Sequence, residues 1–148
     1  MPMMRHATDA DVPTIARIVH DAYVKYVARI GRQPGPMLDD YAARVAVGQV
    51  WVCAEGDEIA GIIVLEPAPD YLLLDNIAVA PGWQGRGVGR ILLAFADSEA
   101  QRAGYPELRL YTHELMHENI ALYARLGWQE YGRGEQAGFQ RVFMRKPL

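Results

Sequence analysis

The sequence predicts a mixed α/β fold in which helices cover both faces of one sheet. Runs of β-branched and aromatic residues alternate with amphipathic helical segments, and Gly and Pro residues separate these segments. Hydrophobic residues make up 51% of the chain and charged residues 22%, a composition typical of a globular protein with a core. A length of 148 residues fits one domain of ordinary size, so we expect a single domain over residues 1–148.

Charge and cysteine content narrow the functional classes. The net charge is −3, which does not favour nucleic acid as a partner. Only six of the 15 basic residues precede Pro81, against eleven of the 18 acidic ones, so an anion would bind more readily to the second half. Cys53 is the only cysteine, which excludes an intramolecular disulfide and favours a reducing, cytoplasmic setting. No run of about 20 apolar residues occurs, so we expect neither a cleaved signal nor a membrane span.

The first third of the chain predicts a strand and two helices. A short strand is expected at 3–6, and Asp9 is a candidate cap for the helix that follows. Two prolines and two glycines within 29–36 end this helix and form a loop near a substrate entrance. A second helix is expected at about 38–47, ending at Gly48. Apolar residues recur at helical spacing in the first helix: Ile15, Ile18, Val19, Ala22, Tyr23 and Tyr26.

From residue 50 onward, runs of β-branched and aromatic residues predict strands. Runs at 50–54 and 59–65 flank a Glu-Gly-Asp turn and predict a hairpin. Residues 71–80 are almost continuously apolar, which predicts a central strand buried on both faces. Asp75 and Asn76 interrupt this run. Polar residues in a buried strand either find hydrogen-bond partners or mark a bulge beside an active site, and both interpretations stay open.

The second half predicts two further helices and three strands. Gly104 and Pro106 separate the first helix from a strand at 108–112, and the next helix runs to Leu126 before Gly127. The first helix carries an apolar stripe of Val88, Ile91, Leu92, Phe95 and Ala96. Strand candidates at 128–132 and 139–146 complete the order β-α-α-β-β-β-α-β-α-β-β.

The segment 84–90, Gln-Gly-Arg-Gly-Val-Gly-Arg, lies between the central strand and a helix. Backbone N–H groups at a helix N-terminus are unpaired, and glycines allow a close approach to them. Arg86 and Arg90 add charge-assisted hydrogen bonds to an anion. We therefore expect this turn to bind a pyrophosphate rather than to be a tight turn without a ligand. A Walker loop would need Lys and Ser or Thr after Gly89, and a dinucleotide fingerprint would need Gly in place of Arg90.

The pattern Gln84-x-x-Gly87-x-Gly89, directly after Ile77-Ala78-Val79-x-Pro81, resembles the acyl-CoA signature of the GNAT superfamily of N-acetyltransferases. The block at 119–128 is also similar to that family. The resemblance implies a mostly antiparallel sheet splayed at its fourth strand, acetyl-CoA as co-substrate without a metal, and direct acetyl transfer to a primary amine of a small molecule or peptide. It implies cofactor contacts by Ile77, Ala78, Val79, Gln84, Gly85, Arg86, Gly87, Val88, Gly89, Arg90 and Asn119.

The same resemblance assigns catalytic roles. Tyr123 matches a tyrosine that protonates the departing thiolate, although its helical spacing also fits a core aromatic residue. The glutamate that many relatives use as a base has no counterpart here, since Leu73 and Tyr111 occupy those positions. We therefore expect deprotonation of the amine through water, assisted by Asp75 or His113. Asn119 is expected to hold the cofactor, to orient Tyr123 or to cap its helix, and the predicted acceptor contacts are Tyr23, Tyr26 and Asn76.

Two alternative functions follow from other features. His113-Glu114-x-x-His117 fits a zinc hydrolase motif if it lies on a helix, with Glu130 or Glu135 as the third ligand. A domain that binds acyl-CoA without turnover is the second alternative. Apolar residues in the last two strands are candidates for a homodimer contact, and no membrane contact is expected.

Overall fold

The computed structural model describes all 148 residues, which form seven strands and four α-helices. Three short 3-10 helices lie at Asp9–Asp11, Gly35–Leu38 and Pro81–Trp83. The other elements are, in chain order, β1 (Met3–His6), α1 (Val12–Ile30), α2 (Tyr41–Ala46), β2 (Val50–Glu55), β3 (Glu58–Pro67), β4 (Leu72–Val79), α3 (Val88–Arg102), β5 (Glu107–His113), α4 (His117–Arg125), β6 (Gln129–Gln136) and β7 (Phe139–Pro147). This confirms the predicted order of strands and helices.

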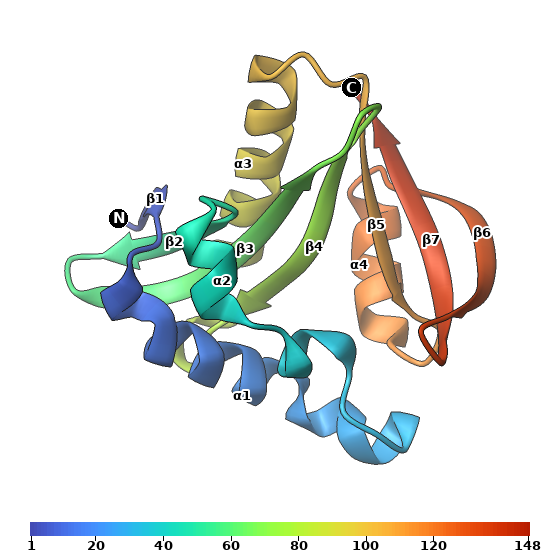
Figure 1. Ribbon diagram of the computed structural model, residues 1–148, viewed down its shortest axis with the longest axis horizontal. Coiled ribbons are helices and arrows are strands. Elements are labelled where there is room, and N and C mark those ends of the chain that lie inside the picture. The colour runs from blue at the N-terminus through green and yellow to red at the C-terminus, as the bar shows by residue number, and fades with distance from the viewer.

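The strands form one sheet in the order β1-β2-β3-β4-β5-β7-β6. All neighbours are antiparallel except β4 and β5, which run parallel and pair only at Leu72 with Leu108 and Leu73 with Arg109. Beyond these two pairs the strands diverge, as Figure 1 shows between the green β4 and the orange-brown β5. The predicted splay at the fourth strand is therefore confirmed.

Two apolar clusters hold the helices against opposite faces of the sheet. One cluster joins α1 and α2 to β2 and β3, with Ile15, Ile62 and Val64 completely buried. The other packs α3 and α4 against the opposite face through residues such as Leu92 and Tyr123. The expected helices on both faces of the sheet are present (Figure 1). None of these helices is long and apolar enough to pass through a membrane.

The helix ends differ from the prediction. Asp9 does not cap α1, because residues 9–11 form a 3-10 helix before it. Thr8 caps this 3-10 helix, and the Asp11 carboxylate accepts a hydrogen bond from Thr8 N at 2.8 Å. The second helix is shorter than expected and begins only at Tyr41, where the Asp40 side chain accepts a hydrogen bond from Ala43 N. Residues 35–38 form a 3-10 helix instead, with Pro34 directly before it and Pro36 as its second residue.

Burial of β4 on both faces is found, but it is not continuous along the strand. Its residues alternate between buried and half-buried, with Leu72, Leu74, Asn76 and Ala78 buried. Leu72 and Leu74 belong to the apolar cluster of α3, whereas Ala78 belongs to the cluster of α1, so buried residues of this strand lie on both faces of the sheet.

Candidate active site

The edge of β4 that faces the splay carries unpaired backbone groups. Ala80 N donates to Ala60 O at 2.8 Å, so the backbone groups of Ala80 face β3. Successive residues of an antiparallel strand face opposite edges, which directs the N–H groups of Ile77 and Val79 toward the diverging β5. Ala78 faces β3 in turn, so its backbone is not available to a ligand. Of the three strand residues predicted to contact a cofactor, two present free donors.

Asp75 forms a bulge in β4, as one of the two interpretations of this position predicts. The β3–β4 register passes from Val64 opposite Asn76 to Leu65 opposite Leu74, leaving Asp75 without a partner. The bulge lies where the strand turns away from β5. It places a carboxylate on the wall of the opening between β4 and β5, where a buried apolar strand would otherwise present only aliphatic side chains.

The Asp75 carboxylate is held by two groups. The Tyr111 hydroxyl donates to Oδ1 at 3.0 Å, and Arg44 Nη2 lies 3.3 Å from Oδ2. Arg44 also pairs with Asp39 and Glu66, so three carboxylates share one guanidinium. Burial raises the pKa of Asp75, although Arg44 and the Tyr111 hydrogen bond oppose this shift. Asp75 is therefore a stronger base than an exposed aspartate, within a hydrogen-bonded setting that fixes its position.

Asn76 satisfies the other interpretation of a polar residue in this strand. Its side chain is 2% exposed, and its Oδ1 accepts a hydrogen bond from the Tyr23 hydroxyl at 2.8 Å. Its Nδ2 donates to the Tyr41 hydroxyl at 2.9 Å. Both ends of the amide are thus bonded within the protein. Asn76 fastens α1 and the start of α2 to β4, and its predicted contact with an acceptor stays a prediction.

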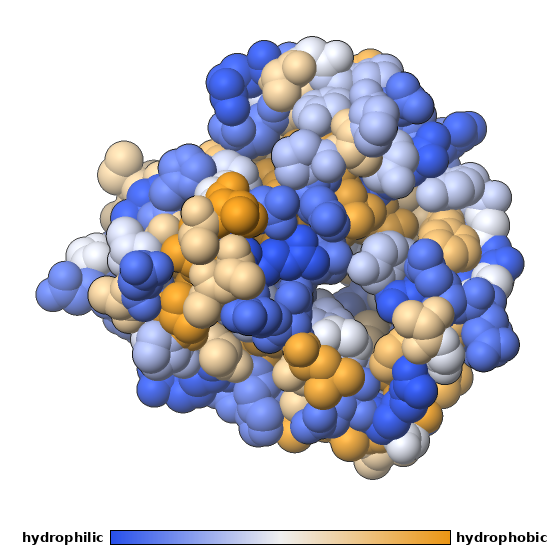
Figure 2. Space-filling view, viewed as in Figure 1, coloured by the Kyte–Doolittle hydropathy of each residue, from blue (hydrophilic) through white to orange (hydrophobic).

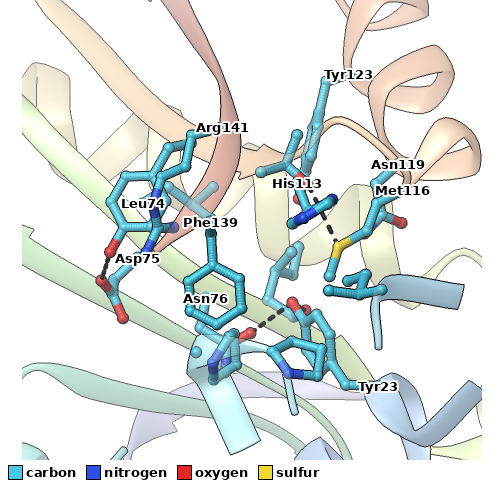
Figure 3. A pocket seen from close by; sticks show the side chains of 17 residues that line it. Tyr23, Leu74, Asp75, Asn76, His113, Met116, Asn119, Tyr123, Phe139 and Arg141 are labelled. Carbon is cyan, nitrogen blue, oxygen red and sulfur yellow. Dashed lines mark hydrogen bonds between the residues drawn. The ribbon is translucent and has the colours of Figure 1, made fainter. Parts of the chain in front are cut away.

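Two cavities open beside β4. The Asp75 cavity lies between β4, β5, β7 and residues 34–36, and Figure 3 shows the side chains that line it. The Gln84 groove lies between α1, β4, the glycine-rich turn and α4. Four residues line both spaces: Tyr23, Ile77, Asn119 and Tyr123. The two cavities therefore meet at this point. Figure 2 shows the molecule hollowed near the middle of this face, with mostly hydrophilic residues around the opening.

The glycine-rich turn forms one end of the Gln84 groove. Gly85 and Gly87 have φ values of +77° and +83°, which side chains other than glycine rarely adopt, so the turn needs glycine at both positions. Gln84 and Gly89 line the groove, whereas the Val88 side chain is buried in the core and leaves only its backbone N–H for a ligand.

The arginines of this turn are free. Arg86 lies over the Trp83 ring, with Cζ 4.0 Å from the ring centroid, and Arg90 is exposed on the first turn of α3. Neither forms an ion pair. They do not line the groove themselves, but they adjoin Gln84 and Gly89, which do. Together with the unpaired N–H groups at the start of α3, they place positive charge next to the groove, which suits a phosphate group.

Tyr123 lies on α4 at the junction of the two cavities. Its ring packs 5.9 Å from the Trp128 ring, and burial raises its pKa, so the phenol stays protonated. The Tyr123 hydroxyl forms no hydrogen bond within the protein and is a free donor at the junction. Asn119, one turn earlier on α4, does not cap the helix, which begins at His117 after Met116. Its amide also lines both cavities.

The two histidines of the His-Glu-x-x-His segment lie on different elements. His113 ends β5, where its Nδ1 accepts a hydrogen bond from Leu115 N at 3.1 Å, and burial lowers its pKa. His117 is exposed at the start of α4, beyond a turn. The helix on which the zinc interpretation depends is therefore not formed, and no three His, Cys, Asp or Glu side chains gather as a metal site. His113 lines the Asp75 cavity with a neutral imidazole.

The structure divides the predicted acceptor contacts between the two spaces and adds residues that the sequence did not single out. Tyr26 lines the Gln84 groove and not the Asp75 cavity, whereas Tyr23 lines both. Lys25 and Leu122 join the groove, and Phe139 and Arg141 of β7 join the cavity. The alternation of β7 was a usable signal for Arg141, because Val142 and Met144 face the core and the intervening positions face the other way.

Comparisons with known proteins agree with this geometry. A family model described as Acetyltransferase (GNAT) domain matches residues 46–130, which include β4, the glycine-rich turn and α4. The N-acetyltransferase YjgM of Escherichia coli (strain K12) is 28% identical over 137 residues, covering 86% of this chain and 82% of its own. N-acetyltransferase family 8 member 2 of Rattus norvegicus is 27% identical over 93 residues, covering 59% of this chain. The chain spans 41% of that rat protein.

A solved structure shares the fold over the full length. The PaiA N-acetyltransferase from Thermoplasma acidophilum, in complex with coenzyme A, superposes with a TM-score of 0.82 at 16% identity, covering 100% of this chain and 99% of that one. The match to the family model over more than half of the sequence, together with the splayed sheet, settles the family. The chain belongs to the GNAT family of acetyltransferases.

Proposed function

We propose that the protein transfers an acetyl group from acetyl-CoA to a primary amine by direct attack in a ternary complex. The observation that carries this proposal is the junction of two cavities beside the free edge of β4, with Tyr123 at the meeting point. The Gln84 groove has the chemistry that coenzyme A requires: two free arginines in the turn beside it and unpaired strand N–H groups along its wall. The Asp75 cavity then receives the amine from the opposite side.

Residues along this path have separate roles. Acetyl-CoA supplies an acyl thioester. The N–H groups of Ile77 and Val79 face the place where negative charge develops on a carbonyl oxygen, and each such donor contributes about 3 kcal/mol to the lowering of a barrier of this kind. The Tyr123 hydroxyl donates the proton that the leaving sulfur requires. Its raised pKa keeps that proton available throughout the neutral and mildly alkaline range.

Asp75 is the group we propose for deprotonation of the amine. An alkylamine is mostly protonated at neutral pH and must lose a proton before it attacks. Asp75 and Ile77 are two residues apart on β4 and line the same cavity, so a water molecule between the carboxylate and the amine would bridge the remaining distance. His113 is a second acceptor on the opposite wall. It is neutral and has its Nδ1 occupied, which leaves only the other ring nitrogen for this role.

Calorimetric titration with acetyl-CoA and a turnover assay with a panel of amines test this proposal. We expect saturable one-to-one binding. We also expect Tyr123→Phe to lower kcat by about 100-fold while leaving acetyl-CoA affinity unchanged, since only the hydroxyl is lost. Tyr131→Phe, on the exposed face of β6, is the matched control. Unchanged turnover in Tyr123→Phe would refute the acid role, and binding without turnover of any amine would favour an acyl-CoA-binding module instead.

A further inference from the structure

Arg141 is a half-buried cation without a carboxylate partner. Three arginines of the chain are half-buried, and two of them have acidic partners: Arg44 with Asp39 at 3.0 Å and Arg109 with Glu107 at 2.7 Å. Arg141 forms no ion pair, and its only hydrogen bond is a long one of 3.4 Å from Nε to Gln136 O. A charge removed from water is costly unless it is paired. The Arg141 guanidinium is therefore able to bind an anionic group of a ligand.

The position of Arg141 directs it to the site. It lines the Asp75 cavity, and its guanidinium lies over the Tyr111 ring with Cζ 4.0 Å from the centroid. Figure 3 shows Arg141 on the same side of the cavity as Asp75, whose carboxylate is already bonded to Tyr111 and paired with Arg44. Stacking on a ring fixes the plane of a guanidinium and leaves its N–H edge free.

A second arginine adds to the positive charge of this wall. Arg32 lies over the ring of Phe139, with Cζ 3.6 Å from the ring centroid, and donates a hydrogen bond to Ala137 O at 3.0 Å. Arg141 lies 5.4 Å from the same ring. Neither cation has an acidic partner. Burial, and to a lesser extent the neighbouring Arg32, lower the pKa of Arg141, although Tyr111 and Asp75 oppose this shift.

We infer that the acceptor is a small amine that also carries a carboxylate, and that Arg141 binds this carboxylate. The inference rests on the proposed function and names the substrate class of the same site. A planar guanidinium binds a carboxylate through two parallel N–H···O bonds, which no other side chain of this cavity provides. The amine of the same molecule then lies toward Asp75 and the junction at Tyr123.

The cover over the cavity favours a small acceptor over a polypeptide. Arg29, near the end of α1, donates to Glu118 at 2.7 Å and to Leu115 O at 2.9 Å, which joins α1 to the start of α4. Arg32 joins the next segment to the turn between β6 and β7. Because these contacts link the segments beside Ile30, Met116 and Phe139, which line the cavity, we expect its opening to admit a single compact molecule rather than a polypeptide.

The test compares acceptors that differ only in the carboxylate. The probes are ω-amino acids of two to five carbons, their amides and the corresponding alkylamines, with CoA release as the readout. We expect kcat/KM of the wild type to be about 100-fold higher for the best amino acid than for its amide. In Arg141→Gln this ratio should fall toward 1, through KM for the acceptor, with acetyl-CoA affinity retained. Arg145→Gln, exposed on the same strand, should keep the wild-type ratio.

Other outcomes separate the inference from the function it rests on. Turnover of amides, alkylamines or diamines at least as fast as amino acids, or a ratio that Arg141→Gln does not change, would overturn the inference and leave the acetyltransferase proposal intact. Diamines as the best acceptors would instead point to the acidic groups around Arg44 as the determinant of specificity. Absence of CoA release with every amine would overturn the proposed function and this inference with it.

Discussion

Gly89 allows cofactor binding to be perturbed without disturbing the fold. It is the second residue of α3 and lines the Gln84 groove. Its φ is in the ordinary range, and a Cβ added there would meet nothing within 4 Å. Gly87 differs, because its positive φ makes any substitution strained. Substitution of Gly89 therefore tests whether a ligand occupies the space next to the start of α3, which no other part of the protein fills.

Two effects of opposite sign follow from this geometry. Glycine in a helix is less favourable than alanine by about 0.5–1 kcal/mol, so Gly89→Ala should stabilise the protein slightly. For a chain of this size such a gain raises the thermal midpoint by about 1–4 °C. A methyl group at the start of α3 also keeps a pyrophosphate from approaching the backbone N–H groups. We expect acetyl-CoA affinity to fall at least about 10-fold, equivalent to about 1.4 kcal/mol, and further in Gly89→Val.

Thermal melting and calorimetric titration of the same samples measure both effects. Gly82→Ala is the matched control, since its Cβ would also meet nothing within 4 Å and Gly82 does not line the groove. The control should bind acetyl-CoA as the wild type does. Wild-type affinity for acetyl-CoA in both Gly89 variants would show that the cofactor does not approach the start of α3. The hypothesis that this turn binds a pyrophosphate would then be wrong. A lower thermal midpoint in Gly89→Ala would contradict the argument that alanine is more favourable than glycine at this helix position.

Three further predictions concern β4 and its neighbours. Because the folded pKa of Asp75 is raised, its ionisation lowers the stability of the protein as pH rises through that pKa. Asp75→Asn should therefore raise the thermal midpoint more at pH 7 than at pH 4, and it should lower turnover. A reversed pH trend of the midpoint would contradict this prediction. Asn76→Ala removes two buried hydrogen bonds, while the Tyr23 and Tyr41 hydroxyls keep Ile77 O and Pro36 O as acceptors, so urea unfolding should show a loss of about 1–3 kcal/mol, and a loss below about 0.5 would refute it. Gly61→Ala places a Cβ 3.0 Å from Ala78 O and from a Val88 methyl, which should cost about 1–3 kcal/mol; an unchanged midpoint would show that α3 can shift.

The sequence predicted the order of elements because each one carries a local signal. Apolar residues at helical spacing indicated α1 and α3, and glycine residues indicated where helices end. Asp75 stood out as a charge within an apolar run, and the structure places it in a bulge. The start of α1 was predicted less well, because a 3-10 helix over Asp9–Asp11, capped by Thr8, precedes it, and Asp9 offers an equally suitable capping side chain.

The charges of the site were the part that could not be read from the sequence. Tyr111 of β5 and Arg141 of β7 lie across the splay from Asp75, and Arg44 comes from α2. These residues are far apart in the sequence, and nothing in the sequence indicates that they are close in space. Arg141 reaches the Tyr111 ring because β7 pairs with β5 in the register that places it opposite His113, and that register is a property of the assembled sheet.

The splay gives this sheet a third edge, enclosed between two of its own strands. Outer edge strands expose N–H and C=O groups to which another chain can add, and proteins usually protect them with charges, prolines or bulges. The inner edge of β4 is a wedge that closes at the pairing of Leu72 with Leu108, with α1 on one side and α4 on the other. A polypeptide strand with side chains on both faces does not fit such a wedge, whereas a slender unbranched molecule enters from its open end. Steric exclusion thus guards this edge against aggregation and keeps it accessible to a narrow ligand.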